Sequence, residues 1–309
     1  MQTIERIHLQ NTPTLPGVTT RPVSFDSAGV RLAGTLYEPS DRQGPAPAVI
    51  VTGAWTTVKE QMAGTYAQQL AGRGFVALAF DFTGWGESEG AVRFKEDPQT
   101  KTADILAAAD FLSCLDSVDP ERVSGVGVCA SSGYMASAVA DHAVLGKLVL
   151  VAAWLHDPAM AEAVYGGPES VAALVQASRE AETEEKILVA ASPSDETSLM
   201  FQAPYYTEPD RGLIAAYDNR FNVSSWEPWL TYDAQASADR LTKPTLIVCS
   251  QAAALPASAT AYAERLKTPP KEIWLDDVNQ FDFYDRKDVV QRVVGDIADF
   301  LGSDRPVEA

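Results

Sequence analysis

Gly127-Val128-Cys129-Ala130-Ser131 is the stretch that decides the fold of this chain. It directly follows the strand-like run 122–126 and leads into a helix that begins with small residues. Small residues two before and two after the centre of a sharp strand-to-helix turn push the central side chain out of the fold. Because the central residue is Cys129, the turn predicts a nucleophile elbow with a cysteine at its tip.

The segments on either side of this turn alternate between strands and helices. Two amphipathic strands are expected first, at 22–27 and 30–38. Apolar strands are expected at 48–51, 75–80, 148–154, 244–248 and 272–275, and helices at 59–72, 98–115, 169–183, 258–266 and 288–301. Continuous Val, Ile and Leu strands joined by helices predict a parallel sheet that is covered on both faces. The sequence therefore predicts an α/β fold with a doubly wound, mostly parallel sheet.

The alternation stops between residues 157 and 240, where aromatic residues are frequent. We interpret 157–240 as a helical lid inserted into a core formed by residues 1–156 and 241–309. Segments inserted at the carboxyl ends of strands cover the sites of this architecture, which favours a lid. Ordinary packing helices at the edge of the sheet are the alternative.

Charge and composition narrow the class of protein. A formal net charge of −18 gives the chain no general attraction for nucleic acid or for an anionic membrane. The sequence has no signal-peptide pattern and no long apolar run, so we expect a cytoplasmic protein without a membrane-spanning helix. Three cysteines indicate reduced thiols, and three histidines argue against a histidine-rich metal site. We expect no metal and no other cofactor, and a homodimer is one possibility that the sequence leaves open.

Four segments, taken together, resemble the α/β-hydrolase superfamily, and in particular its dienelactone-hydrolase-like and peptidase-S15-like branch. They are VKEQM at 58–62, FDFTGWGES at 80–88, GVCASSGY at 127–134 and FDFYD at 281–285. The match spans nearly the whole chain and implies the α/β-hydrolase fold. It is weaker evidence for the reaction, because one fold serves many chemistries.

The elbow also predicts an oxyanion hole. One donor is expected to be the backbone N–H of Ala130, the residue after the nucleophile. The other should come from the loop Gly53-Ala54-Trp55 after the first buried strand, with Ala54 as the first choice and Trp55 as the second. Trp55 is also expected either to form a wall of the pocket or to pack beneath the lid.

The catalytic partners that the resemblance implies are missing. A histidine is expected in the loop after the last strand, where this chain has Gln280. An acid is expected after the strand at 244–248, but residues 250–256 contain no carboxylate. Glutamine can hydrogen-bond a thiol, a water or a carbonyl, but it cannot accept a proton at neutral pH. The absence of the acid is consistent with the absence of the histidine, because the role of the acid is to orient that histidine.

Other residues are candidates for the missing roles. His156 follows Trp154 at the carboxyl end of a strand, so we predict that it lies in the pocket and is the base for Cys129, with a hinge role as the alternative. Asp157 could orient it or act as a carboxylate, and Tyr284 could point inward as a donor or weak acid. At the start of a helix, the thiol of Cys129 should have a lowered pKa.

Three functions fit these residues. The first is a hydrolase that attacks the carbonyl of an ester, lactone or thioester through Cys129 with a non-standard triad. The second is a lyase, isomerase or cyclase of a biosynthetic pathway that uses the oxyanion hole and the lid pocket. The third is a non-catalytic ligand-binding protein on the same scaffold. The aromatic residues of the lid predict a small apolar or aromatic ligand in each case.

Overall fold

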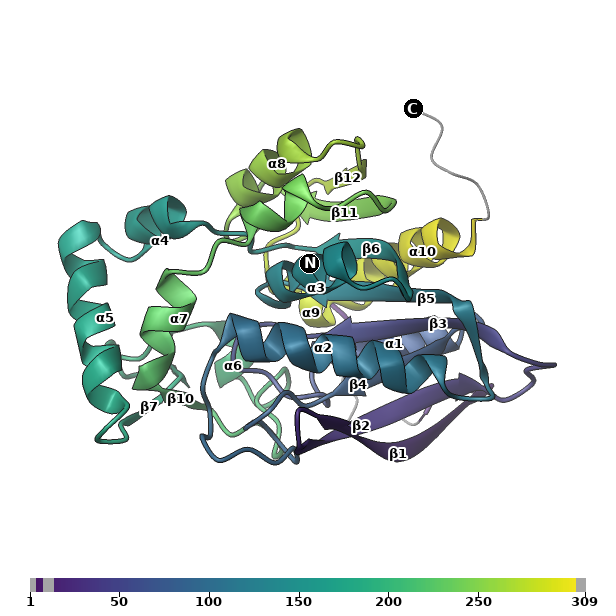
Figure 1. The fold of residues 1–309 in the computed structure, drawn as a ribbon, viewed down its shortest axis with the longest axis horizontal. Coiled ribbons are helices and arrows are strands. Elements are labelled where there is room, and N and C mark those ends of the chain that lie inside the picture. The colour runs from purple at the N-terminus through teal and green to yellow at the C-terminus, as the bar shows by residue number, and fades with distance from the viewer. Residues whose placement is uncertain (1–3, 8–13, 304–309) are drawn as a thin grey trace.

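A computed structural model describes residues 4–7 and 14–303. Its main sheet has eight strands in the order β1-β2-β4-β3-β5-β6-β11-β12 (Figure 1). The strands are β1 Val18–Ser27, β2 Val30–Pro39, β3 Ala46–Thr52, β4 Val76–Phe80, β5 Val118–Val128, β6 Leu145–Val151, β11 Thr245–Ser250 and β12 Lys271–Leu275. β1 and β2 form an antiparallel hairpin joined to β4, and the strands from β4 to β12 run parallel. The predicted α/β fold with a mostly parallel sheet is therefore confirmed.

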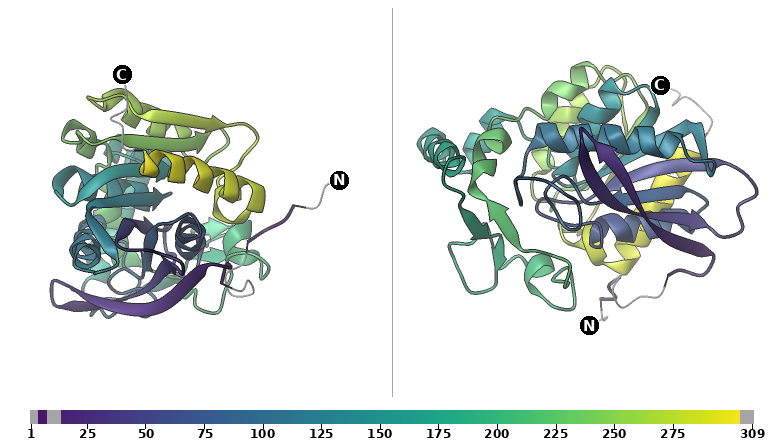
Figure 2. Two further views of the ribbon diagram at one scale, coloured as in Figure 1. Left: turned by 90° about the vertical axis from the view of Figure 1, so that its right-hand side faces the viewer. Right: turned by 60° about the horizontal axis from the view of Figure 1, so that its bottom comes forward.

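Helices cover both faces of this sheet (Figure 2). One layer contains α1 Met62–Ala71 and α10 Lys287–Gly302, which contact each other, and the other contains α2 Pro98–Ser113, α3 Ser131–Asp141 and α8 Pro256–Arg265. Because both faces are covered, every residue of β4 is buried, as expected for a central parallel strand. None of the helices in the described part of the chain is long and apolar enough to cross a membrane.

The segment between β6 and β11 lies beyond one end of the sheet, where α4, α5 and α7 project to the left in Figure 1. Its elements are α4 Pro158–Val164, α5 Pro168–Ala181, β7 Ile187–Val189, β8 Ala191–Ser192, β9 Met200–Phe201, α6 Pro204–Thr207, β10 Arg220–Asn222, η1 Val223–Ser225, α7 Trp226–Leu230 and η2 Gln235–Asp239. The helix expected at 169–183 is present as α5. The two small sheets, β7 with β10 and β8 with β9, had no visible strand pattern because each strand has only two or three residues.

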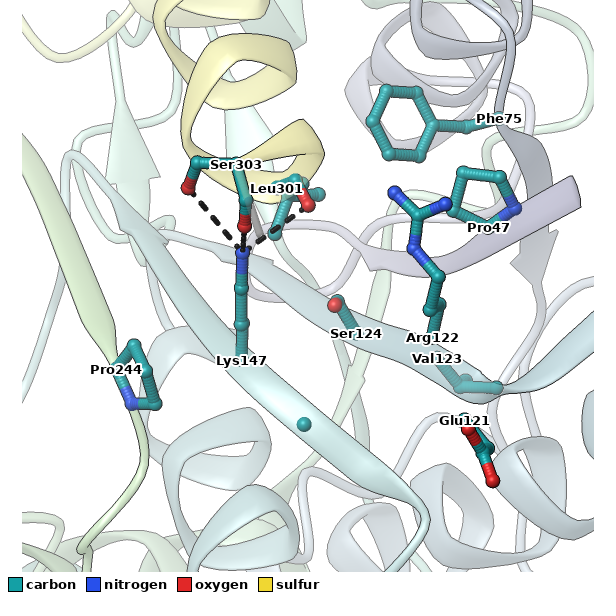
Figure 3. A pocket seen from close by; sticks show the side chains of 11 residues that line it. Pro47, Phe75, Glu121, Arg122, Val123, Ser124, Lys147, Pro244, Leu301 and Ser303 are labelled. Carbon is teal, nitrogen blue, oxygen red and sulfur yellow. Dashed lines mark hydrogen bonds between the residues drawn. The ribbon is translucent and has the colours of Figure 1, made fainter. Parts of the chain in front are cut away.

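A small hollow of about 290 Å³ lies at the amino ends of the parallel strands, away from the elbow (Figure 3). Lys147 reaches across it from β6, and its Nζ donates to the carbonyl oxygens of Phe300 and Leu301 at 3.0 and 3.2 Å. These carbonyls belong to the last turn of α10, where the helix leaves them without partners of its own. The lysine therefore fixes the end of the last helix to the sheet.

Candidate active site at the Cys129 elbow

Cys129 lies where β5 ends and α3 is about to begin. Its φ of +59° is in the left-handed region, which residues other than glycine rarely adopt. Its N–H donates to the Val151 carbonyl and its own carbonyl accepts from the Trp154 N–H, both at 3.0 Å. A Cβ at Gly127 would lie 2.7 Å from Ser132 Cα, so only glycine lets the helix start this close to the strand. This strained and braced backbone is the geometry of a nucleophile elbow.

Two backbone N–H groups, from Ala130 and Trp55, act on the Cys129 sulfur as donors that oppose the rise of its pKa. The oxygen of an acyl group attached to this sulfur would lie within reach of the same donors, as in an oxyanion hole. The first choice for the second donor, Ala54, is wrong because its N–H donates to Met62 Sδ at 3.4 Å. The second choice, Trp55, has an N–H that acts on the sulfur as a donor.

Gln280 is a fixed part of the site. Its Oε1 accepts from the Ala254 N–H at 2.9 Å, and its Nε2 donates to the Ala152 carbonyl at 3.0 Å and to Tyr284 Oη at 2.8 Å. The Tyr284 hydroxyl in turn acts on the Cys129 thiol as a donor that opposes the rise of its pKa. The Ala254 N–H, which orients Gln280, belongs to the segment 250–256, where an acid was expected. Gln280 is connected to the surroundings of the sulfur through its bond to Tyr284 Oη.

The Cys129 thiol is held in its neutral form. Burial raises its pKa, and the nearby Glu96 carboxylate raises it further, against the opposing effect of hydrogen bonds from Tyr284, Ala130 and Trp55. The prediction that the start of the helix lowers this pKa is therefore wrong. Cys129 is only 8% exposed, and the loss of hydration outweighs what the helix terminus contributes.

Alkylation by iodoacetamide should therefore be slow at neutral pH. We expect Cys129 to react at least about tenfold more slowly at pH 7 than the exposed Cys114, with a rate that rises up to and beyond the ordinary thiol pKa of about 8.5. Peptide mass spectrometry measures both rates in one sample, and a Cys114→Ala variant removes the competing thiol. A rate that is high and constant between pH 6 and pH 8 would show a thiolate and contradict this assignment.

His156 lies behind the wall of the site. It is 1% exposed, its Nδ1 accepts from Trp154 Nε1 at 3.1 Å, and its Nε2 donates to the Trp229 carbonyl at 2.8 Å. With both ring nitrogens engaged, no atom is available to take a proton from Cys129. The predictions that His156 is the base and lies in the pocket are therefore wrong. It instead holds two tryptophans that do line the cavity.

Asp157 is also outside the cavity lining. It precedes α4 and its Oδ1 accepts from the Met160 N–H at 2.8 Å, so it caps this helix. The prediction that Asp157 lies in the pocket is wrong, because the first turn of α4 uses its carboxylate.

His156 should make the fold less stable below neutral pH. Burial lowers its pKa from 6.5, whereas the unfolded chain keeps the ordinary value. As the pH falls through about 6.5, the unfolded state binds a proton that the folded state does not, so the free energy of unfolding decreases. Urea unfolding of the wild type and of His156→Gln between pH 5 and pH 8 tests this. The variant should lose this part of the slope, and an unchanged slope would contradict the assignment.

Cys129 opens into a cavity of about 840 Å³. Its wall combines loops at the carboxyl ends of the strands with residues of the segment 158–239. The aromatic side chains in the wall are Trp55, Trp154, Tyr165, Tyr206, Trp229, Phe281 and Tyr284. A cavity of this volume with an apolar wall and few polar groups suits a drug-sized apolar ligand.

Several residues that line the cavity were not predicted from the sequence. Tyr206 is one of them, and the aromatic content of its segment was the only indication of a role. Arg211 and Arg6 also line the cavity, and both donate to Asp285, at 2.7–2.8 Å and at 3.1 Å respectively. These arginines come from distant parts of the chain, so no local motif could place them together.

Glu60, Asp81 and Glu87 form the only cluster with metal-ligand spacing in the described ranges 4–7 and 14–303. Lys59 Nζ lies 2.6, 2.8 and 2.7 Å from their carboxylates in that order. The ammonium group therefore supplies the positive charge at this position.

The comparisons with known proteins agree with the fold. Residues 48–292 match the model of the Alpha/beta hydrolase family. The uncharacterized protein YcjY of Escherichia coli K12 is 30% identical over 297 residues, which cover 90% of this chain and 97% of that protein. The thiohydrolase aneE of Aspergillus aculeatus is 32% identical over 103 residues, 33% of this chain and 31% of that protein. The crystal structure of hypothetical protein PA2218 from Pseudomonas aeruginosa has a TM-score of 0.80 at 24% identity and covers 97% of this chain and 100% of that one.

Proposed function

Because the chain belongs to the alpha/beta hydrolase family, we propose that it is a cysteine-dependent acyl hydrolase whose preferred substrate is a thioester. The observation that carries the proposal is the position of the Cys129 sulfur between two backbone N–H donors and the Tyr284 hydroxyl. Thiols exchange with thioesters without a strong base, which suits a site that lacks a histidine partner. The similarity to a thiohydrolase supports a thioester over an oxygen ester or a lactone.

In the acylation step, the Cys129 sulfur attacks the carbonyl carbon and the carbonyl oxygen moves between the N–H groups of Trp55 and Ala130. The thiol proton passes to Tyr284 Oη while the Tyr284 proton passes to the departing sulfur. The carbon–sulfur bond of the substrate then breaks, leaving an acyl-cysteine and a free thiol. Tyr284 never becomes a tyrosinate, which agrees with a pKa raised well above its ordinary value by burial.

In the deacylation step, water attacks the acyl-cysteine and gives a proton to Tyr284 Oη, while Tyr284 returns its own proton to the Cys129 sulfur. Gln280 keeps the hydroxyl in line for this relay by donating to Oη. Since no strong base activates the water, deacylation is the slower step. The acyl-cysteine should therefore accumulate during turnover.

The substrate's acyl group would occupy the aromatic cavity, which favours a small apolar or aromatic acyl chain. We assign the segment 157–240 the role of a lid, because Val164, Tyr165, Met200, Tyr206 and Trp229 come from it and line the cavity. Closing such a lid excludes bulk water from the reacting groups.

A non-hydrolytic lyase, isomerase or cyclase reaction is the second candidate. The observation that favours it is that no histidine in the part of the chain that the structure describes is available as a base for the sulfur, since His156 is occupied by two other partners. In that case, the two N–H groups and Tyr284 would polarise a substrate carbonyl and no acyl-cysteine would form.

Trapping the acyl-enzyme tests the proposal. The protein is mixed with the phenylacetyl thioester of N-acetylcysteamine, quenched in acid within seconds and analysed by intact mass and peptide mapping. We expect one phenylacetyl group on the Cys129 peptide before the first turnover is complete. Hydrolysis without this adduct would contradict covalent catalysis at Cys129. Binding of the thioester with neither adduct nor hydrolysis would leave the second candidate or a non-catalytic binding protein.

A further inference from the structure

We propose that Glu96 is a positioning residue that fixes the distance between the two N–H donors around Cys129. This inference rests on the proposed function, because it assigns Glu96 a role in holding the oxyanion hole of that reaction. Glu96 contacts neither the sulfur nor the cavity wall, so it acts through the elements that carry the donors.

One carboxylate bridges both of these elements. Glu96 Oε1 accepts from the Thr56 N–H at 2.7 Å, and Thr56 directly follows Trp55. Glu96 Oε2 accepts from the Tyr134 hydroxyl at 3.2 Å, and Tyr134 lies in the first turn of the helix that follows Ala130. Glu96 is fully buried, so water cannot replace these bonds.

The loop needs this brace because its backbone is strained. Thr56 has φ of +61°, a conformation that costs on the order of 1 kcal/mol or more for a residue with a Cβ. Its hydroxyl is within 3.1 Å of the Tyr217 hydroxyl, and its N–H bonds Glu96. Without the carboxylate, the buried N–H would lack an acceptor and the loop could relax, carrying the adjacent Trp55 N–H away from the sulfur.

A buried cation keeps the carboxylate from opposing the reaction. Lys101 Nζ lies 2.7 Å from Glu96 Oε2, and 4.7, 4.8 and 5.8 Å from the ring centroids of Phe82, Trp85 and Tyr134. An unpaired buried carboxylate would repel the negative charge that develops on the substrate oxygen. Because Lys101 neutralises it, Glu96 can hold the Thr56 loop and Tyr134 in place without leaving a net charge beside the oxyanion hole.

Five titratable groups on the surrounding elements interact electrostatically with the Cys129 thiol. They are the Glu96 carboxylate and the hydroxyls of Tyr134, Tyr165, Tyr206 and Tyr284. Burial raises the pKa of each of these four tyrosines, so their hydroxyls stay neutral at neutral pH.

Glu96→Gln tests the role with little change in shape. The glutamine amide oxygen can still accept from the Thr56 N–H, but its NH2 group cannot accept from the Tyr134 hydroxyl or pair with Lys101, so the bridge to α3 is lost. We expect kcat for the thioester to fall about 30- to 100-fold while KM changes less than about threefold, because a misplaced donor weakens the transition state more than substrate binding. Asp104→Asn is the matched control. Asp104 is a buried carboxylate on α2, the helix that begins two residues after Glu96, and it accepts from Ser27 Oγ at 2.6 Å and from the Thr83 N–H at 2.8 Å. It should lower Tm and leave kcat within about threefold.

The pH profile of Cys129 alkylation separates this role from a merely structural one. Glu96→Gln removes a negative charge and should shift the profile to lower pH. Lys101→Met leaves the carboxylate uncompensated and should shift it to higher pH, and the double variant should return close to the wild-type profile. Shifts in the same direction for both single variants would contradict the electrostatic assignment.

A reversible ketone probe reads the oxyanion hole without turnover. A phenyl trifluoromethyl ketone adds the Cys129 S–H across its carbonyl, forming a carbon–sulfur bond and a hydroxyl between the Trp55 and Ala130 N–H groups. Glu96→Gln should weaken its binding about tenfold or more, and Asp104→Asn should not. Wild-type kcat together with wild-type ketone affinity in Glu96→Gln would overturn the inference. If the wild type failed to turn over thioesters while the variant still lost ketone affinity, the proposed function would fall and the role of Glu96 would stand.

Discussion

Cys129→Ala should lower kcat/KM for thioester hydrolysis by on the order of 10⁴-fold or more, because it removes the atom that forms the acyl intermediate. Cys129→Ser should be almost as inactive. A serine hydroxyl needs a base to become a nucleophile, and both nitrogens of His156 are already bonded to other groups. Steady-state assays of the purified variants over a range of substrate concentrations measure both losses.

Cys249→Ala is the matched control for this experiment. Cys249 is a second buried free cysteine, on β11, and is not part of the cavity wall. Its variant should keep kcat within about threefold, although the methyl-sized void should lower Tm. Retention of most of the activity by Cys129→Ala would rule out covalent catalysis at this position, and a highly active Cys129→Ser would reveal a base that the geometry does not account for.

Tyr284→Phe should lower kcat by about 10² to 10³-fold with a small change in KM, because it removes the hydroxyl that relays protons to and from the sulfur. The substitution keeps the ring, and Gln280 Nε2 keeps its bond to the Ala152 carbonyl. We expect acylation and deacylation to slow together, since both steps use the same hydroxyl. Rapid-quench measurement of acyl-enzyme formation and decay separates the two rates.

Tyr66→Phe is the control for the loss of a buried hydroxyl. Tyr66 is fully buried on α1 and donates to the Phe283 carbonyl at 2.8 Å without contact to the sulfur. It should lower the free energy of unfolding by about 1 kcal/mol and leave kcat nearly unchanged. Equal losses of activity in the two variants would mean that the effect of Tyr284→Phe is structural.

The fold could be predicted because its signals are local. Continuous apolar strands such as 75–80 and the small residues around Cys129 need no knowledge of distant contacts, and the sheet and elbow follow from them. The boundaries shifted by a few residues: β6 ends at Val151, and the chain after it turns into the site. The short strands of the segment 158–239 gave no periodic signal.

The candidate site could be predicted only in part, because its details depend on which hydrogen bonds form. Ala54 and Trp55 are adjacent, and the difference between them rests on a contact with Met62 Sδ from a neighbouring helix. His156 is at the expected end of its strand, but partners at Trp154 and Trp229 occupy both of its nitrogens. Such competition between partners cannot be read from residue order.

The burial of Cys129 has a consequence for the lifetime of the protein. Peroxide attacks the thiolate, so a sulfur that stays protonated between turnovers is slow to enter the path to sulfenic and sulfinic acids. The thiol of Cys114 is exposed and should therefore react with peroxide before Cys129 does. If Cys129 is the nucleophile that we propose, its burial makes it slower to react with a substrate but also slower to be oxidised than an exposed thiolate at the same elbow.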